Sequence, residues 1–274
     1  MRIKVSHETT YTYAAAVRSA VQLLRMTPRS HEGQFVRRWR IEIDADARMD
    51  RSEDAYGNIT HLIFIDGPVD HLRIRIDGEV DTEDTNGILR GTIERQPPQL
   101  FLRQTALTEP TPAIARFARD CRASQGGDIL ASLHRMNGQL HSRMAFRPGT
   151  TTAATAAGAA YDAGQGVCQD FANVFLAAAR VLKIPCRYVS GYYLRTDTLE
   201  QEAGHAWVEA FVDNLGWVGF DPAHGTSVTD RYVRLAVGCD YLDAAPIRGT
   251  QSGGTDETLK VAVRVEQGRM MIQE

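Results

Sequence analysis

Three residues of this chain have side chains that together suit acyl transfer: Cys168, His205 and Asp221. They occur in this order within the stretches GVCQDFA (166–172), GHAWV (204–208) and GFDP (219–222). A cysteine thiolate is a nucleophile, a neighbouring imidazole transfers the proton, and a carboxylate orients the imidazole. These residue types predict a thiol-dependent reaction at the carbonyl carbon of an amide.

The segment after Cys168 has the pattern of a buried helix. Apolar side chains recur at steps of three, four and seven residues, at Phe171, Val174, Phe175, Ala178 and Leu182. The glycines at 164 and 166 interrupt whatever precedes them, so Cys168 is expected in the first turn. The free amide N–H groups and the positive end of the helix dipole favour a thiolate there.

His205 and Asp221 lie in a predicted β-hairpin. Residues 205–212 and 217–221 alternate and are rich in aromatic and β-branched side chains, and Asp213-Asn-Leu-Gly216 between them is typical of a turn. A five-residue loop would pair Ala210 with Gly216 and place His205 opposite Asp221. A four-residue loop would place the two on opposite faces of the sheet, so joint action requires an odd loop or a bulge.

Each assignment has an alternative. His224 competes with His205 for the role of base, but it follows Pro222 in a loop, where lining a pocket or facing solvent suits it better. Asp221 could simply cap a turn, although its spacing from His205 favours the orienting role. Asp170, in the first helical turn, either stabilises the helix start or lines the pocket, and it is not assigned to catalysis.

The other cysteines, Cys121, Cys186 and Cys239, are expected to be small buried apolar residues. None of the four cysteines forms a C-x-x-C pair, which excludes the zinc-ribbon and redox motifs of that spacing. We predict no metal and no cofactor.

The chain resembles the bacterial branch of the transglutaminase-like superfamily of papain-like cysteine enzymes. The resemblance rests on residues 166–193, 204–225 and 234–249, and on YTYAAAV (11–17), LLRMTPR (23–29) and DAYGNITH (54–61) in the first third. It implies a papain-like core with a Cys168-His205-Asp221 triad and an acyl-enzyme, preceded by an accessory domain. The chain departs from the family at Asn173, where a histidine is expected, and at His224, where asparagine is usual.

Composition limits the function classes. The 274 residues exceed one ordinary core, so two domains are expected. A net charge of −3 without a Lys/Arg run argues against nucleic-acid binding. The first residues lack an apolar leader, and no apolar run of membrane-spanning length occurs, so we expect no membrane partner and a cytoplasmic location.

The predicted fold is α+β. Residues 1–105 form a β-rich N-terminal accessory domain, with strands at 2–13, 35–43, 58–65 and 72–81 that suggest a small antiparallel sandwich. Prolines between 96 and 112 mark the boundary, and residues 106–274 form the catalytic domain, in which a nucleophile helix packs on an antiparallel sheet.

Within the catalytic domain, Thr111 and Asp128 are expected to cap helices at 113–122 and 129–144. Residues 186–194 read as a strand. The stretch 150–163 is either a small-residue helix or a substrate loop. Residues 249–254 are expected to form a flexible loop before a last strand at 259–265.

The expected chemistry is attack of Cys168 on an amide, with proton transfer by His205. The Cys168 backbone N–H is the natural oxyanion donor, and Gln165 is a candidate for the second donor. Water as acceptor gives a cysteine peptidase or amidase acting on a peptide or protein substrate, the favoured reading. An amine as acceptor gives transglutaminase-type transamidation of glutamine. A non-catalytic binding module that retains the fold is the third reading.

Overall fold

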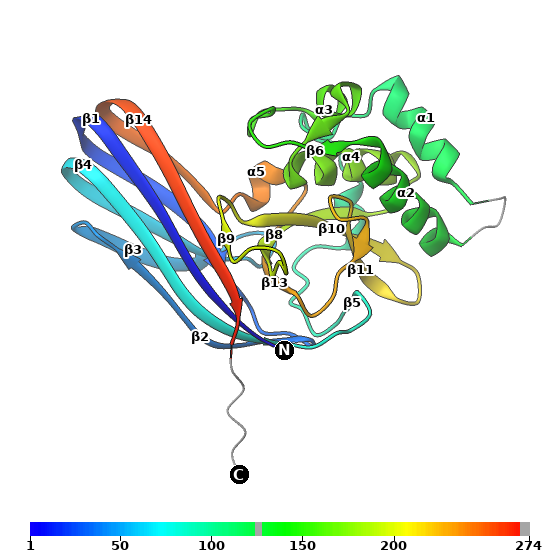
Figure 1. Cartoon of the computed structure of the whole chain (residues 1–274), viewed down its shortest axis with the longest axis horizontal. Helices are drawn as coiled ribbons and strands as arrows, with labels where there is room; N and C mark the ends of the chain where they lie inside the picture. The colour runs from blue at the N-terminus through cyan, green and yellow to red at the C-terminus, as the bar shows by residue number, and fades with distance from the viewer. Residues whose placement is uncertain (124–127, 269–274) are drawn as a thin grey trace, which may run out of the picture.

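The computed structural model describes residues 1–123 and 128–268, which form two units (Figure 1). The long-strand unit is a sheet of extended strands, and the helical unit combines a shorter sheet with the helices. Both six-stranded sheets are antiparallel, which confirms the predicted α+β class. Along the described ranges, no helix has both the length and the apolar composition that crossing a membrane requires.

The long-strand unit takes strands from both ends of the chain. Its order is β2-β4-β1-β14-β9, with β3 paired to β4. The bounds are β1 Arg2–Thr27, β2 Gln34–Ile43, β3 Ala47–Glu53, β4 Ile59–Thr82, β9 Glu200–Gln201 and β14 Ile247–Gln267.

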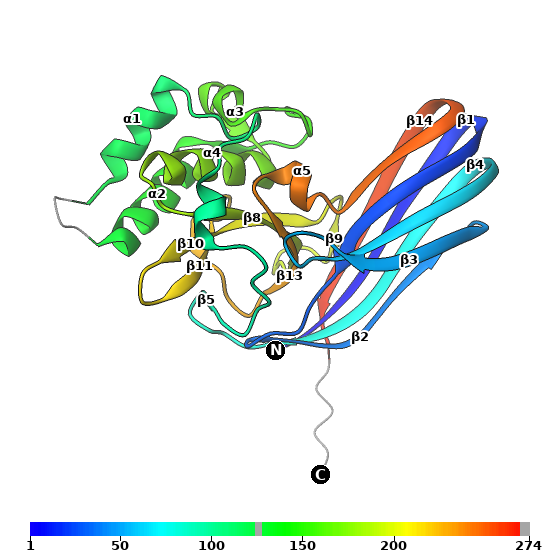
Figure 2. The ribbon, with the colours of Figure 1, turned by 180° about the vertical axis from the view of Figure 1, so that it is seen from behind.

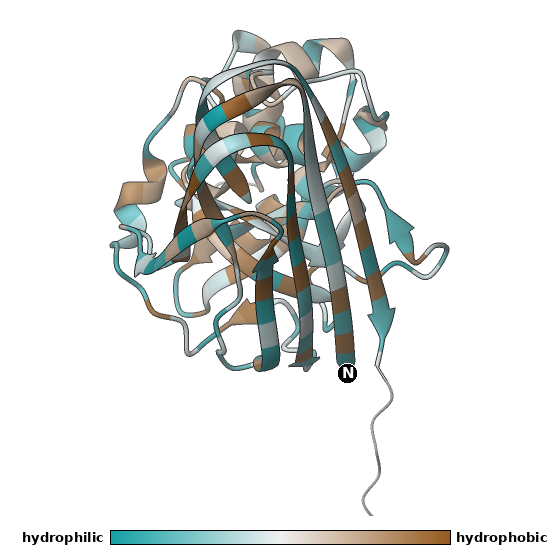
Figure 3. Ribbon diagram, turned by 90° about the vertical axis from the view of Figure 1, so that its left-hand side faces the viewer, coloured by the Kyte–Doolittle hydropathy of each residue, from teal (hydrophilic) through white to brown (hydrophobic). Residues whose placement is uncertain are grey.

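The longest strands, β1, β4 and β14, bend near their middles, so the sheet folds over on itself (Figures 1 and 3). At the bend a Cβ on Gly67 would lie 2.1 Å from the Val17 carbonyl oxygen, so this approach requires glycine. Apolar residues of both halves fill the space between them, including Tyr11, Leu24, Ile63, Ile65, Ile74 and Ile76. The result is the predicted sandwich-like arrangement.

Several predicted strand limits differ from the structure. The predicted strands at 58–65 and 72–81 are the two halves of β4, and the strand predicted at 2–13 continues to Thr27. The flexible loop predicted at 249–254 is wrong, because these residues pair with β1. They lack apolar alternation because nearly all are exposed on both faces of the strand, so backbone pairing alone holds them.

The last strand also crosses the predicted division at residue 105. That division assigns β14 to the catalytic domain, whereas β14 pairs with β1 along most of its length. Val263 and Val265 are buried with Ile3 and Val5, which explains why this segment joins the first sheet.

The helical unit is built on a sheet of order β12-β11-β10-β8-β13, with β5 paired to β11. The bounds are β5 Ile88–Leu89, β8 Cys186–Tyr193, β10 His205–Val212, β11 Gly216–Asp221, β12 Thr226–Ser227 and β13 Tyr232–Gly238. The strand predicted at 186–194 is thus confirmed to within one residue.

Helix α4 (Cys168–Val181) packs on β10 and β8, and other helices cover it on its far side (Figure 2). These are α1 (Pro112–Cys121), α2 (Ile129–Arg143) and α3 (Ala157–Ala163). Thr111 accepts a hydrogen bond from the Ile114 amide and Asp128 from the Leu130 amide, so both predicted caps are confirmed. Of the stretch 150–163, only the part from Ala157 onward is helical.

Short elements complete the helical unit. The 3-10 helix η1 (Pro98–Leu102) precedes α1, and α5 (Tyr241–Ala244) leads into β14. The two-residue strands β6 (Ala145–Phe146) and β7 (Gln165–Gly166) pair in parallel just before α4.

Helix α4 is buried on every side, beyond the single apolar face that the sequence predicts. All residues from Asp170 to Arg180 are buried. The Arg180 guanidinium donates to the carbonyl oxygens of Phe101, Cys186 and Cys239 and to the Thr108 hydroxyl. These bonds hold a buried charge and attach the segment before α1 to the end of α4.

A buried ion cluster ties the middle of the helical unit's sheet together. Glu209 of β10 accepts from Arg187 of β8 at 2.6 Å and from Arg234 of β13 at 2.7 Å. Arg187 also binds Glu94 at 2.7 Å, and Gln34 of the long-strand unit accepts from the Arg234 amide. The cluster therefore joins three neighbouring strands and reaches the other unit.

Candidate active site

The backbone before α4 is shaped to begin a helix at Cys168. Gly164 adopts a left-handed conformation with φ of 64° and ends α3. The Asp170 carboxylate accepts a hydrogen bond from the Val167 amide at 2.8 Å, so it stabilises the start of α4. A Cβ on Gly166 would lie 2.5 Å from the same carboxylate, which requires glycine there. Cys168 is therefore the first residue of the helix, as predicted.

The hairpin that holds His205 and Asp221 has a three-residue loop. Val212 pairs with Gly216 and Val208 with Phe220, so the loop is neither the five-residue nor the four-residue loop considered from the sequence. Asn214 and Gly216 adopt positive φ of 67° and 85°, which lets the chain turn within a shorter loop. The loop is still odd, so His205 and Asp221 share a face, diagonally rather than directly opposite.

Asp221 is the centre of a hydrogen-bond cluster. Its Oδ2 accepts from His205 Nε2 at 2.6 Å, from His224 Nδ1 at 2.7 Å and from the Tyr232 hydroxyl at 2.8 Å. Its Oδ1 accepts from the amides of Ala223 at 3.0 Å and His224 at 3.2 Å. The carboxylate is completely buried, and these five bonds fix its position.

Cys168 completes the row, because its thiol lies close enough to the His205 ring to raise the pKa of that imidazole. Because Nε2 of His205 bonds to Asp221, Nδ1 is the ring nitrogen left for the sulfur. Burial by itself lowers the pKa of His205, but the charges of Asp221 and Cys168 and the bonds to them outweigh burial and raise it to about 10. An imidazolium at this position stabilises a thiolate.

The Asp221 carboxyl responds in the opposite sense. Burial by itself raises the pKa of Asp221, but the charge of His205 and the hydrogen bonds from His205 and His224 hold it well below its usual range. The carboxylate is therefore ionised across the pH range in which a protein is folded.

His224, the alternative base, also belongs to this cluster: its ring bonds to the same carboxylate oxygen as His205 and lies 5.0 Å from the His205 ring. Cys168, however, raises the pKa of His205. The His224 side chain is 36% exposed, against 8% for His205. His224 thus lies where it can position Asp221 rather than receive a proton from the thiol.

Two tyrosines at the site carried no signal in the sequence. The Tyr193 ring lies 5.4 Å from the His205 ring, 4.6 Å from the His224 ring and 4.7 Å from the Tyr232 ring. Tyr193 and Tyr232 are register partners on β8 and β13, a pairing that no local motif marks. Trp207 is a further aromatic neighbour, with its ring 6.2 Å from that of His205 and 5.2 Å from that of Tyr232.

The remaining cysteines are buried, as expected. Burial raises the pKa of Cys121 to about 11 and that of Cys186 to about 12, and it also raises the pKa of Cys239. Cys168 is partly exposed. It therefore combines access with an activating neighbour, and the other three lack both.

Spacing alone would let His205, Asp221 and His224 hold a metal ion, because their ligand atoms lie within 4.8 Å of one another. Both imidazole nitrogens that face Asp221 are, however, already bonded to its carboxylate. The expected absence of a metal stays a prediction, as does the role of Gln165, which lies in β7 three residues before Cys168.

Comparisons with known proteins show the family of this chain. Residues 3–81 match the bacterial transglutaminase-like N-terminal region, and residues 115–222 match the transglutaminase-like superfamily. An uncharacterized protein of Mycobacterium leprae is 30% identical over 278 residues, covering 96% of this chain and 98% of that protein. The chain belongs to the transglutaminase-like superfamily. The resemblance noted in the sequence is confirmed.

Two further relatives are informative. A crystal structure described as "a Putative Cysteine Protease from Cytophaga hutchinsonii" has a TM-score of 0.75 and 18% identity, covering 100% of this chain and 92% of that one. This likeness shows a shared fold. A protein-glutamine gamma-glutamyltransferase of Pseudomonas aeruginosa is 29% identical over 152 residues, which are 49% of this chain and 22% of that protein.

Proposed function

We propose that this protein is a cysteine enzyme that transfers the acyl group of an amide through Cys168, His205 and Asp221. The observation that carries the proposal is the row of three side chains, in which His205 bonds at 2.6 Å to the buried Asp221 and the partly exposed Cys168, at the start of α4, raises the pKa of the same ring. A purely structural cysteine needs neither a helix start nor an imidazole whose pKa is raised to about 10. The superfamily membership supports the same chemistry.

In the first half-reaction the Cys168 sulfur forms a bond to the amide carbonyl carbon. The imidazolium of His205 gives its proton to the amide nitrogen, the carbon–nitrogen bond breaks, and the amine leaves. Asp221 holds the imidazole in place and stabilises its charge. The developing oxyanion lies near the start of α4, where the Cys168 amide N–H has no partner within the helix.

The acceptor in the second half-reaction decides the activity. Water, activated by the now neutral His205, would release an acid, and the enzyme would be a peptidase or amidase, which we favour. An amine would give a new amide, and the name of the Pseudomonas aeruginosa relative supports this alternative. The substrate proposed for both is a peptide or protein amide.

A mass-resolved assay tests the proposal and separates the two acceptors. Peptides containing glutamine are incubated with the protein with and without added methylamine, and ammonia, new peptide termini and methylamide products are measured. Hydrolysis gives termini or ammonia regardless of methylamine, whereas transamidation requires it. Activity that persists in Cys168→Ala would refute the nucleophile. Binding of peptide without any turnover would instead favour the non-catalytic module.

A further inference from the structure

The long-strand unit presents an unpaired strand edge on the side of the helical unit. Within the described residues, β14 is paired on its outer side only through Val263 and Arg264, which meet Gln201 and Glu200 of β9. Residues 247–262 of β14 therefore have free backbone groups on that side. An unpaired strand edge of this kind can form backbone hydrogen bonds with a further extended segment.

The chain itself shows that this edge accepts an extended segment. Strand β9 lies on it in antiparallel orientation and, with Leu199, adds a backbone bond from Val265. After Gln201 the chain leaves the edge and reaches His205 four residues later. The free part of the edge therefore begins where the chain turns toward the catalytic histidine.

Helix α5, which leads directly into β14, packs through Tyr241 against the same apolar cluster as Cys168. The Tyr241 ring lies 6.1 Å from that of Tyr188, which belongs to this cluster. On β14, Leu259 is on the same face as Val263 and Val265, which pack against residues of the helical unit. Leu259 consequently faces the side of the sheet on which the helical unit lies.

Large apolar side chains are exposed on the elements around this edge. Leu259 on β14 is 53% exposed, Leu242 on α5 is 37% exposed, and Leu199 next to β9 is 43% exposed. On β14, Leu259 continues the row of Val261, Val263 and Val265, which is buried where the two units meet. Above that contact the units diverge (Figures 1 and 2), and the row becomes exposed.

We propose that an extended, apolar stretch of the substrate polypeptide binds as an added strand on the free edge of β14, next to Leu259 and Leu242. This inference rests on the proposed function, because the bound strand delivers its amide to Cys168. The edge groups of β14 pair with the substrate backbone, and alternate side chains of the substrate cover the exposed leucines. A strand advances about 3.3 Å per residue, so the substrate residues that contact Leu259 are remote in sequence from the reacting amide.

The inference can be tested with electrophilic peptides that label Cys168, because labelling does not depend on which acceptor the enzyme uses. The probes are acetyl-Thr-Val-Thr-Val-Thr-Gly chloromethyl ketone, the same peptide with serine in place of valine, and the valine peptide with N-methylated valines. The Cys168 sulfur bonds to the methylene carbon and chloride leaves. Second-order labelling rate constants are measured by mass spectrometry. Iodoacetamide, which carries no peptide, serves as the control for the reactivity of Cys168 itself.

We expect the valine peptide to label fastest and N-methylation to remove its advantage, because it deletes backbone donors. Leu259→Ser should lower the valine-peptide rate about fivefold, through lost apolar contact, and leave the iodoacetamide rate unchanged. Phe35→Ser, an exposed apolar residue at the opposite edge of the same sheet, is the matched control and should change neither rate.

Equal rates for the N-methylated and unmodified peptides would overturn the strand-addition proposal while leaving the proposed function intact. So would an effect of Leu259→Ser no larger than that of Phe35→Ser. If iodoacetamide itself shows no preference for Cys168 over the buried cysteines, the proposed function and this inference both fail.

Discussion

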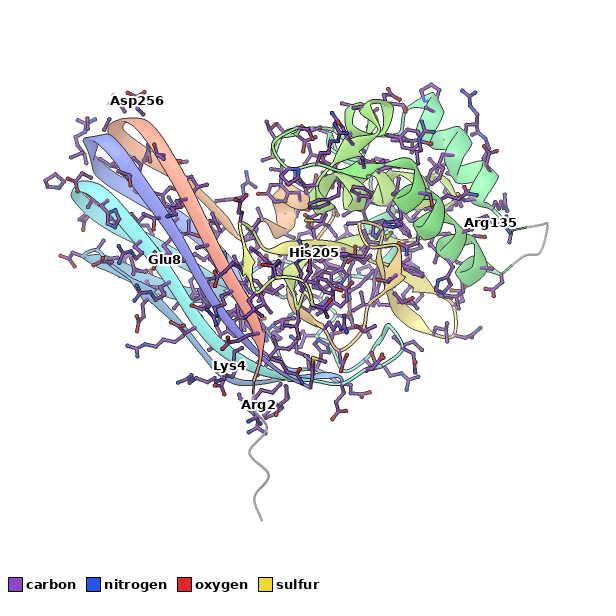
Figure 4. All side chains as sticks on the ribbon, in the orientation of Figure 1. Arg2, Lys4, Glu8, Arg135, His205 and Asp256 are labelled. Atoms are coloured by element: carbon purple, nitrogen blue, oxygen red, sulfur yellow. The ribbon has the colours of Figure 1, made fainter. Side chains whose placement is uncertain are left out.

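A single carboxylate oxygen, Asp221 Oδ2, accepts hydrogen bonds from two imidazoles and a phenol. His205, whose pKa is also raised by Cys168, lies at the middle of the molecule among densely packed side chains (Figure 4). The two histidines therefore bond to the same carboxylate but are expected to have different roles.

Substitution of the two histidines should separate these roles. His205→Ala should reduce kcat/KM by about 100- to 10,000-fold, the range of a lost acid–base group. His224→Ala should cost less than about tenfold, because nucleophile and base remain in place, and Asp221→Ala should cost less than His205→Ala. Steady-state amide turnover measures each effect. A larger loss in His224→Ala than in His205→Ala would reverse the base assignment.

The pH dependence should report the charge of His205. His205 keeps the proton that it gives to the leaving amine until the pH approaches its own pKa, and since that pKa is raised to about 10, the rate of Cys168 acylation is expected to fall near pH 10, the alkaline limb of the profile. Asp221→Asn removes the carboxylate that raises this pKa, so the limb should move to lower pH by about one unit or more. Acylation rates between pH 5 and about 11 test the shift. An unchanged limb would mean that Asp221 does not set this ionisation.

At the level of the element, the start of α4 depends on the missing side chain of Gly166. Gly166→Ala should destabilise the protein and slow iodoacetamide labelling of Cys168, because the added Cβ lies 2.5 Å from the capping carboxylate of Asp170. Gly138→Ala in α2 is the matched control. Nothing lies within 4 Å of a Cβ there, so it should stabilise by about 0.5–1 kcal/mol through helix propensity. Urea denaturation and labelling rates measure both variants.

The strands of the helical unit depend on Glu209. Burial by itself raises the pKa of Glu209, but Arg234 and Arg187 lower it to about 2. The stability it contributes is thus complete above its unfolded value near pH 4.5 and is lost as pH falls toward 2. Glu209→Ala should cost about 3 kcal/mol, because the partly buried Arg234 loses its carboxylate partner and the fully buried Arg187 keeps only Glu94. The exposed Glu200→Ala should cost less than about 1 kcal/mol in the same denaturation experiment.

Elements that depend on neighbouring residues could be predicted from the sequence, whereas those that depend on distant pairing could not. The caps at Thr111 and Asp128 and the helix start at Cys168 depend on residues within one turn, so the sequence predicts them well. The hairpin register depends on positive φ at Asn214, for which the sequence offers only a general turn signal. Tyr232 reaches Asp221 from a strand that joins the sheet through β8, and such non-local pairing has no local motif.

At the scale of the whole molecule, the α+β class, the sandwich-like unit and the papain-like core follow from apolar periodicity and the family resemblance. The place of β14 does not. Its residues around 249–254 carry no apolar alternation, and what holds them is pairing with β1 at the other end of the sequence. Sequence periodicity indicates which side chains of an element are buried. The position of this segment depends instead on the pairing of its backbone with β1.

That pairing has a consequence for synthesis of the protein. While the ribosome makes the chain, β1 and β4 emerge early, yet β14, their partner on the edge of β1, emerges only after the entire helical unit. Until β14 has been made, one edge of β1 therefore has no partner strand, and unpaired strand edges promote misassembly. We expect a chain ending at residue 246 to aggregate and to regain solubility when a peptide of residues 247–267 is co-expressed, as sedimentation of lysates would show. A soluble, monomeric product of residues 1–246 would mean that the early strands do not need β14 to avoid aggregation.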